Sequence, residues 1–257
     1  MESVIGFIPA AGIGSRMKGF PICKELLPVP AALSETEKTS ILIDNAIQSM
    51  INSGIKVIVF VVNDEKQELV HYINRKYAYE NRIQAAFVYQ KIDSKHYGIP
   101  FAIKSAYHLL EGKNVVMRFP DTSLSGDFNL AEMLQFHQEK ESELTLGVFS
   151  TRHPERLGPV QIGPNGEIVA IEDKPKNPNI YNTWNCIIWK QAFMEELLNR
   201  INKWEADGRG DEIILADIMR DFVTHNKKTF AYAYEDVTCI DVASTNEFEK
   251  IWQIKVN

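Results

Sequence analysis

The chain has 257 residues, of which 45% are hydrophobic and 24% charged, so it can bury a sizeable core and lacks the composition of a disordered protein. Its net charge of -6 argues against a general binder of nucleic acid or anionic membranes, because such partners attract a positive field. The three cysteines are widely spaced without a CxxC pair, which is typical of reduced thiols in a cytosol. No basic leader precedes the first strand pattern, and the longest apolar run, residues 57–62, is too short to cross a bilayer. We therefore expect a soluble, cytoplasmic protein.

The first half of the chain alternates between patterns of buried strands and of helices with one apolar face. Continuous β-branched runs such as residues 57–62 predict central strands that are buried on both faces of a sheet. The alternation predicts the α/β fold class, with a doubly wound, mostly parallel, Rossmann-like sheet whose ligands lie beyond the carboxyl ends of the strands. In chain order we predict a strand at 4–9, a helix at 41–52, a strand at 57–62, a helix at 65–76, a strand at 86–90, a helix at 100–110 and a strand at 115–119.

From about residue 142 the strands become shorter and are separated by turns that contain Pro, Asn and Gly. This pattern predicts strands at 144–150, 160–163, 168–172, 184–189 and 230–234, and helices at 191–204, 212–225 and 246–252. Nothing between the two halves resembles a flexible linker. We expect a single domain over residues 1–257, with a nucleotide-type half at 1–141 and a smaller, mixed α+β half at 142–257 that covers one edge of the sheet.

The first predicted strand ends in a glycine turn, A-A-G-I-G-S-R-M-K, and two cations follow the turn. Gly12 and Gly14 would let the main chain approach a phosphate or a base closely, although such a turn can also bind nothing. A P-loop would need G-K-[ST] here, and a dinucleotide fingerprint would need a glycine or alanine where Met17 stands. The guanidinium of Arg16 suits bidentate phosphate contact, and Lys24 supplies a point charge. This order of groups indicates phosphoryl chemistry on a triphosphate.

The segments A-A-G-I-G-S-R-M and K-E-L-L-P resemble the signature of the sugar-1-phosphate nucleotidyltransferases, also called nucleoside-diphosphate-sugar pyrophosphorylases. The motifs I-P-A-A-G and P-D-T are most similar to those of the glucose-1-phosphate uridylyltransferases and thymidylyltransferases. Further segments follow in the order of that family, among them L-G-P-V, E-D-K-P, R-G-D-E-I and C-I-D-V. The resemblance therefore extends along most of the chain.

The resemblance implies an enzyme that depends on magnesium (Mg²⁺) and transfers a nucleotidyl group from a nucleoside triphosphate, with UTP or dTTP favoured, to a sugar 1-phosphate. The products would be a nucleoside-diphosphate sugar and pyrophosphate. As catalytic residues it implies Arg16, which would hold the departing pyrophosphate, and Lys24, which would reach toward the α-phosphate. The implied nucleotide-binding residues are Ala11, Gly12, Gly14, Gln90 and Gly98; the sugar-phosphate-binding residues are Gly158, Glu172, Asp173, Lys174, Asn185 and Arg209; the metal ligands are Asp121 and Asp241.

The residue types suit these roles, although each also has an ordinary structural use. Asp121 and Asp241 each follow a short strand pattern, and one or two carboxylates suffice to hold Mg²⁺ together with phosphate oxygens. Either aspartate alone also fits a turn cap. Lys174 and Arg209 could grip a phosphate, whereas R-G-D-E could also be a helix entry with Arg209 in solvent. Gln90 offers a base edge both a donor and an acceptor.

Three departures from the family pattern leave the acceptor open. Arg16 and Lys24 are eight residues apart, two fewer than we expect in the most similar families. Asp173 precedes Lys174 where the family usually has Glu, and Asn185 stands where it usually has Gly. The acceptor pocket would therefore gain bulk and a hydrogen-bonding amide.

Two other functions remain open. One is a cytidylyltransferase that acts on a non-sugar alcohol phosphate, and the other is a catalytically silent nucleotide-sugar sensor on the same fold. The presence of both cations and both aspartates argues against a silent protein. As partners we expect a nucleoside triphosphate and a sugar 1-phosphate, with no nucleic acid and no membrane. Members of the family are commonly dimers or tetramers, so the resemblance is compatible with a homo-oligomer.

Overall fold

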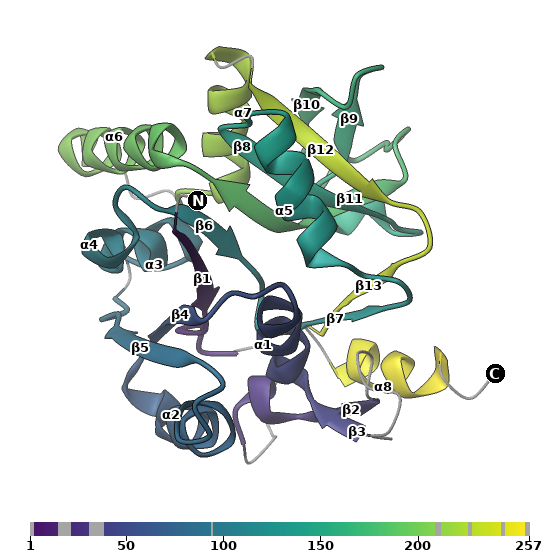
Figure 1. The fold of residues 1–257 in the computed structure, drawn as a ribbon. Coiled ribbons are helices and arrows are strands. Elements are labelled where there is room, and N and C mark those ends of the chain that lie inside the picture. Colours follow the sequence, from purple (N-terminus) through teal and green to yellow (C-terminus); the bar gives the residue numbers. More distant parts are fainter. Residues whose placement is uncertain are drawn as a thin grey trace.

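A seven-stranded sheet runs through the computed structural model of the chain (Figure 1). The structure describes residues 3–14, 22–30, 39–93, 95–208, 212–225, 228–242 and 245–254. The order of the strands is β12 (Thr229–Tyr234), β8 (Leu144–Ser150), β11 (Asn182–Trp189), β6 (Asn114–Met117), β1 (Val4–Pro9), β4 (Val57–Val62) and β5 (Gln84–Tyr89). β5, β4, β1 and β6 are mutually parallel, β12 is parallel to β8, and β11 is antiparallel to both β6 and β8. The predicted mostly parallel, Rossmann-like α/β class is confirmed.

Helices cover both faces of the sheet and bury two hydrophobic clusters against it. On one face lie α3 (Ile99–Ser105), α6 (Gln191–Asp207) and α7 (Leu215–His225), and on the other lie α1 (Leu42–Asn52), α2 (Gln67–Ile73) and α5 (Leu130–Glu139). The side chains of β4 alternate between the two clusters, with Val59 and Val61 in one and Ile58 and Phe60 in the other. A strand that contributes to two cores must be apolar throughout, which is why residues 57–62 are a continuous hydrophobic run.

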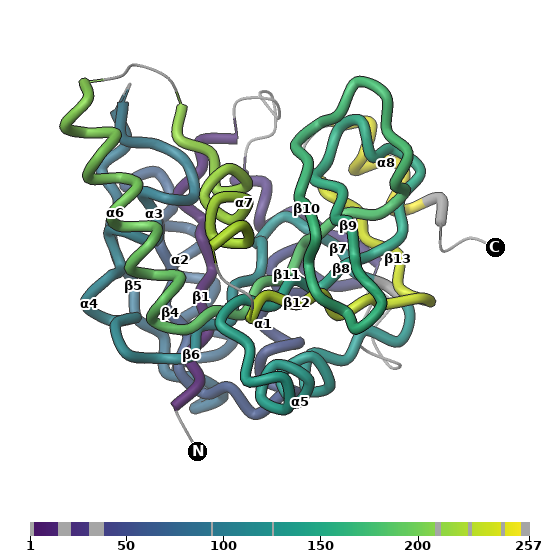
Figure 2. Tube along the Cα trace, turned by 90° about the horizontal axis from the view of Figure 1, so that it is seen from above, coloured from purple at the N-terminus to yellow at the C-terminus, as the bar shows by residue number. Residues whose placement is uncertain are grey.

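Three short two-stranded sheets and two further helices complete the fold. They are β2 (Pro28–Pro30) with β3 (Thr39–Ile41), β7 (Thr122–Ser125) with β13 (Thr238–Asp241), β9 (Val160–Ile162) with β10 (Ile168–Ile171), and the helices α4 (Tyr107–Leu110) and α8 (Thr245–Ile254). Figures 1 and 2 both show α6 on one flank of the molecule and the β9–β10 hairpin on the other. In the central sheet, β6 is followed by β11, β8 and β12, so the C-terminal half of the chain extends the sheet beyond β6.

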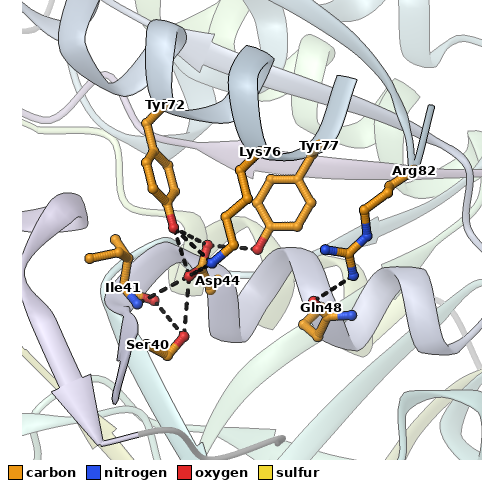
Figure 3. A network of polar contacts seen from close by, with 8 residues as sticks. All are labelled: Ser40, Ile41, Asp44, Gln48, Tyr72, Lys76, Tyr77 and Arg82. Carbon is orange, nitrogen blue, oxygen red and sulfur yellow. Dashed lines mark hydrogen bonds and ion pairs between the residues drawn. The ribbon is translucent and has the colours of Figure 1, made fainter. Parts of the chain in front are cut away.

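The segment predicted as a helix at 65–76 is helical, but its winding changes along its length. It consists of a 3₁₀ turn at Asp64–Lys66, then α2, then a π-helical turn at Asn74–Ala78. A π turn aligns residues five apart, so Tyr72 and Tyr77 lie on one face and both donate a hydrogen bond to Asp44 of α1 (Figure 3).

Asp44 is the centre of this polar network, and its carboxylate is buried. It accepts hydrogen bonds from the hydroxyl of Tyr72 at 2.7 Å, the hydroxyl of Tyr77 at 2.6 Å, the amine of Lys76 at 2.7 Å and the backbone N–H of Ile41 at 3.0 Å (Figure 3). Burial and the negative Asp44 raise the pKa of Tyr77 far above its ordinary value, so the hydroxyl remains a donor. The network joins the start of α1 to the π turn, which explains why the winding changes there.

Other predicted bounds also differ from those in the structure. The predicted helix at 100–110 is divided at Ala106 into α3 and α4, and Ser105 Oγ donates to the Ala102 carbonyl in the last turn of α3. The predicted strand at 115–119 ends as β6 at Met117. The elements β2, β3, β7 and α5 were not predicted from the sequence.

A buried histidine makes the stability of the fold depend on pH. His137 of α5 is 1% exposed, and its Nδ1 lies 2.8 Å from Thr145 Oγ1 of β8. Burial, and secondly the nearby Lys190, lower the pKa of His137 to about 4. Between about pH 6.5 and pH 4, His137 is protonated in the unfolded chain but neutral in the folded chain. The free energy of unfolding therefore decreases as the pH falls through this range.

We expect the free energy of unfolding to fall by about 2 kcal/mol between pH 7 and pH 5 on account of this residue. His137→Gln removes the titrating group and should make the decrease smaller by that amount. Urea denaturation of both proteins at the two pH values measures the difference. Equal decreases in the wild type and the variant would show that His137 is not responsible.

Candidate functional site

A cleft of about 430 Å³ lies at the carboxyl ends of the parallel strands, where the fold class predicts the ligand. The ends of β1, β5 and β6, the start of α3, the β9–β10 region, β11 and β13 all contribute side chains or backbone to it. Of the site residues predicted from the sequence, those that line the cleft are Ala11, Gly12, Lys24, Gln90, Gly98, Asp121, Gly158, Asp173, Lys174, Asn185 and Asp241. Arg16 and Arg209 lie outside the described residues, and Gly14 and Glu172 are described but do not line the cleft.

One backbone and one side-chain hydrogen bond join neighbouring strand ends at the predicted nucleotide end of the cleft. The backbone N–H of Gln90 donates to the Val62 carbonyl at 2.8 Å, and Asn63 Nδ2 donates to the Ala11 carbonyl at 2.6 Å. These bonds fix the ends of β1, β4 and β5 side by side. Gly98 has φ +87, a conformation that side chains rarely adopt, where the chain enters α3. Gln90 is 7% exposed, and its Nε2 has no hydrogen-bond partner among the described residues.

The centre of the cleft combines one cation with two carboxylates. Lys24, in a 3₁₀ turn at Lys24–Leu26, forms an ion pair with Asp121. Asp241 is adjacent, because it pairs with Thr122 across the β7–β13 ladder and the next residue donates its N–H to the Asp121 carbonyl at 2.8 Å. Burial alone lowers the pKa of Lys24, but attraction to Asp121, Glu25 and Asp241 outweighs it and raises the pKa above its ordinary value. The ammonium therefore stays charged at any physiological pH.

A buried ion pair lies next to Lys24 in the chain, and no pattern in the sequence predicted it. Lys66 Nζ and Glu25 Oε2 are 2.7 Å apart, and the two side chains are 5% and 1% exposed. Glu25 also lines the cleft and follows Lys24 in the chain. The pair ties the turn that carries Lys24 to the segment after β4, and so positions the ammonium.

Lys66→Met should lower the free energy of unfolding by about 3–5 kcal/mol, because it leaves Glu25 buried without its counter-charge. The double variant Glu25→Gln/Lys66→Met removes both charges and should recover most of that loss. Urea denaturation of the wild type, both single variants and the double variant measures the coupling. If the double variant is no more stable than Lys66→Met, the two residues do not act as a pair.

The predicted sugar-phosphate end is formed by the turn after β10 and by the segment before β9. Lys174 has φ +45 and donates its backbone N–H to the Leu157 carbonyl at 2.8 Å, which presents its side chain to the cleft next to Gly158. A left-handed conformation at a non-glycine residue is typical of functional sites. Of the two consecutive acids, Asp173 lines the cleft and Glu172 does not.

A β-bulge in β11 sets which side chains reach the cleft. The register against β8 shifts between Trp184 and Cys186, so Asn185 is the extra residue. As a result Trp184 and Asn185 both line the cleft, whereas Cys186 is fully buried in the core. Trp184 is half-buried and also packs against one of the two hydrophobic clusters of the core. Trp184 packs against Phe119, with 5.8 Å between ring centroids, and a side chain on Gly158 would clash with its indole.

The donor set of the cleft fits a hard divalent cation. Asp121, just before β7, and Asp241, at the end of β13, both line the cleft. Within the part of the chain that the structure describes, no group of three or more His, Cys, Asp or Glu residues could hold a metal ion. Mg²⁺ is commonly held by one or two carboxylates, with waters and substrate phosphates as its other ligands, so two aspartates are sufficient.

A parallel sheet with its cleft at the carboxyl ends of the strands is the architecture of the α/β proteins that bind nucleotides. The chain belongs to the nucleotidyl transferase family, whose model matches residues 5–253. It is 24% identical over 250 residues to a glucose-1-phosphate adenylyltransferase of Bacillus thuringiensis (strain Al Hakam) and 25% identical over 251 residues to one of Mycoplasma mobile. These matches cover 91% of this chain but only 63% and 62% of the relatives.

The same fold occurs in a candidate glucose-1-phosphate thymidylyltransferase of Bacillus anthracis whose structure was solved in complex with sucrose. The TM-score is 0.80 at 19% identity, and the match covers 98% of this chain and 94% of that one. Among the described helices of our chain, none combines the length and apolar character needed to cross a membrane.

Proposed function

We propose that the protein transfers a nucleotidyl group from a nucleoside triphosphate to a sugar 1-phosphate and releases pyrophosphate. One observation carries the proposal: the ion pair of Lys24 with Asp121, next to Asp241, lies in the same cleft as Gly12 of the glycine turn and Lys174. This arrangement supports the proposal, because one cleft holds a cation that could contact a triphosphate and a separate cation that could contact an acceptor phosphate.

In the proposed reaction an oxygen of the acceptor phosphate forms a bond to the α-phosphorus of the nucleotide. The bond from that phosphorus to the oxygen that bridges it to the β-phosphate breaks, and pyrophosphate leaves. Since no proton has to move at the reacting centre, catalysis is mainly positioning and stabilisation of charge. Lys24 would stabilise charge at the α-phosphate, Arg16 would hold the pyrophosphate, and Lys174 with Arg209 would orient the attacking phosphate.

Asp121 and Asp241 would hold Mg²⁺, which would neutralise charge on the phosphate oxygens. Gln90 would contact the base, because its amide lies in the cleft with an unpaired Nε2. We favour UTP or dTTP as the nucleotide, although the curated relatives are described as adenylyltransferases. We also propose that the enzyme acts in the cytoplasm and assembles as a dimer or tetramer.

A screen of pyrophosphate release tests the proposal. The purified protein is incubated with Mg²⁺ and each of ATP, UTP, dTTP and CTP against glucose 1-phosphate, galactose 1-phosphate, glucosamine 1-phosphate and phosphocholine. Release with a hexose 1-phosphate is expected. Release with CTP and phosphocholine alone would indicate the alternative cytidylyltransferase. Absence of release, with calorimetric binding of a nucleoside-diphosphate sugar, would instead indicate a sensor.

A further inference from the structure

Asn185 and Thr122 form a buried polar contact in the wall of the cleft. Asn185 Nδ2 donates to Thr122 Oγ1 at 2.9 Å, and both residues line the cleft. Asn185 is 7% exposed and Thr122 is 1% exposed. The contact joins β11 to the start of β7, immediately after Asp121 in the chain.

This contact leaves one acceptor and one donor without a partner in the described part of the chain. The amide nitrogen of Asn185 faces Thr122, and the amide oxygen Oδ1 is buried with no hydrogen-bond partner. Thr122 Oγ1 accepts a hydrogen bond from Asn185, so the hydroxyl of Thr122 can still donate its hydrogen to a ligand. A buried carbonyl oxygen without a partner costs about 1–3 kcal/mol, which a ligand can recover by donating to it.

The β-bulge is the reason that this oxygen belongs to the cleft. In a regular strand the neighbours of Asn185 would point to the opposite face, but the register shifts at this residue, and Thr183, Trp184 and Asn185 all line the cleft. The irregular pairing of β11 with β8 therefore coincides with a residue whose amide oxygen is buried without a partner in the described part of the chain. If Asn185 served only to stabilise the strand, a partner for both of its amide atoms would be expected.

We propose that Asn185 and Thr122 together recognise one hydroxyl group of the acceptor. This inference rests on the proposed function and specifies its acceptor. A hydroxyl can donate to Asn185 Oδ1 and accept from the Thr122 O–H at the same time. A quaternary ammonium has no hydrogen to donate, and a deoxy position can do neither. The pair therefore selects against phosphocholine and against the deoxy analogue at the recognised position.

The test compares acceptors and variants in one matrix. Values of kcat/KM are measured at saturating nucleotide for glucose 1-phosphate and galactose 1-phosphate, their 2-, 3-, 4- and 6-deoxy analogues, and phosphocholine. The proteins are the wild type, Thr122→Val, which keeps the shape of the side chain, and Asn185→Gly. In the wild type, loss of one particular hydroxyl should lower kcat/KM by about 10- to 100-fold. In either variant, removal of the same hydroxyl from the acceptor should change kcat/KM by less than about 3-fold.

Lys174→Ala serves as the control, because Lys174 would grip the phosphate that all these acceptors share. It should lower kcat/KM for every acceptor by a similar factor and leave their ranking unchanged. Asn185→Gly should instead change the ranking and improve the relative activity on glucose 1-phosphate.

Two results would overturn the hydroxyl pair while leaving nucleotidyl transfer intact. One is a decrease in kcat/KM that is equal for every deoxy analogue, in the wild type and in both variants. The other is turnover of phosphocholine in preference to the hexose phosphates. Absence of turnover with every acceptor would overturn the proposed function and the hydroxyl pair together.

Discussion

Replacement of Asp121 by Asn is expected to abolish turnover while leaving the fold intact, and Asp241→Asn is expected to do the same. Each change keeps the shape of the side chain but replaces a carboxylate by a neutral amide, which is a much weaker ligand for Mg²⁺. Both carboxylates line the cleft, Asp121 from the residue before β7 and Asp241 from the end of β13. Loss of either should lower kcat by about 10³-fold or more, equivalent to about 4 kcal/mol of transition-state stabilisation.

Pyrophosphate release measured over a range of Mg²⁺ concentrations checks this result, and urea denaturation shows whether the variants are folded. Asp236→Asn is a matched control, since Asp236 is an exposed acid in the turn between β12 and β13. It should keep the kcat of the wild type. If Asp121→Asn or Asp241→Asn retained near-normal kcat at limiting Mg²⁺, the metal assignment would be wrong for that residue.

Lys24→Met should lower kcat by about 10²- to 10³-fold and change the KM for the nucleotide much less. The ammonium is positioned in advance by Asp121 and by the buried pair behind it, so its charge is available where charge develops in the transition state. Because attraction to the surrounding acids keeps the pKa of Lys24 above its ordinary value, deprotonation of Lys24 should not reduce activity between pH 7 and pH 9.

Steady-state kinetics at several pH values test both statements. Lys56→Met is the control, since Lys56 is exposed just before β4. An effect of Lys24→Met on KM alone would assign Lys24 to ground-state binding of the nucleotide. A loss of wild-type activity with a midpoint near pH 8 that is absent from Lys24→Met would show that the ammonium titrates in that range.

Local sequence patterns predicted those elements whose burial is uniform along the strand. β1, β4 and β8 have the predicted bounds because each is buried along most of its length, and β4 is apolar throughout. The order of the strands in the sheet could not be predicted from local patterns. The position of β11 between β6 and β8 is decided by pairing between segments that are far apart in the chain, and local periodicity does not record it.

The candidate site was predictable where a residue type, a strand end and a family motif coincide, as at Gly12, Asp121 and Lys174. All three line the cleft, although their roles remain predictions. What the sequence could not reveal depends on local geometry. The bulge at Asn185 changes the direction of side chains without any turn residue, and the pairing of Lys66 with Glu25 joins residues that are distant in sequence.

The antiparallel strand β11 also bears on how the protein is made. β1, β4, β5 and β6 are complete once residue 117 has been synthesised, but the free side of β6 is paired only by β11, at residues 182–189. A nascent chain on the ribosome would therefore present an unpaired, apolar strand edge while the intervening segment is translated. Chaperones that shield such edges should matter during biosynthesis. A gene fragment that ends before β11 should yield aggregates in place of a separable nucleotide-binding unit.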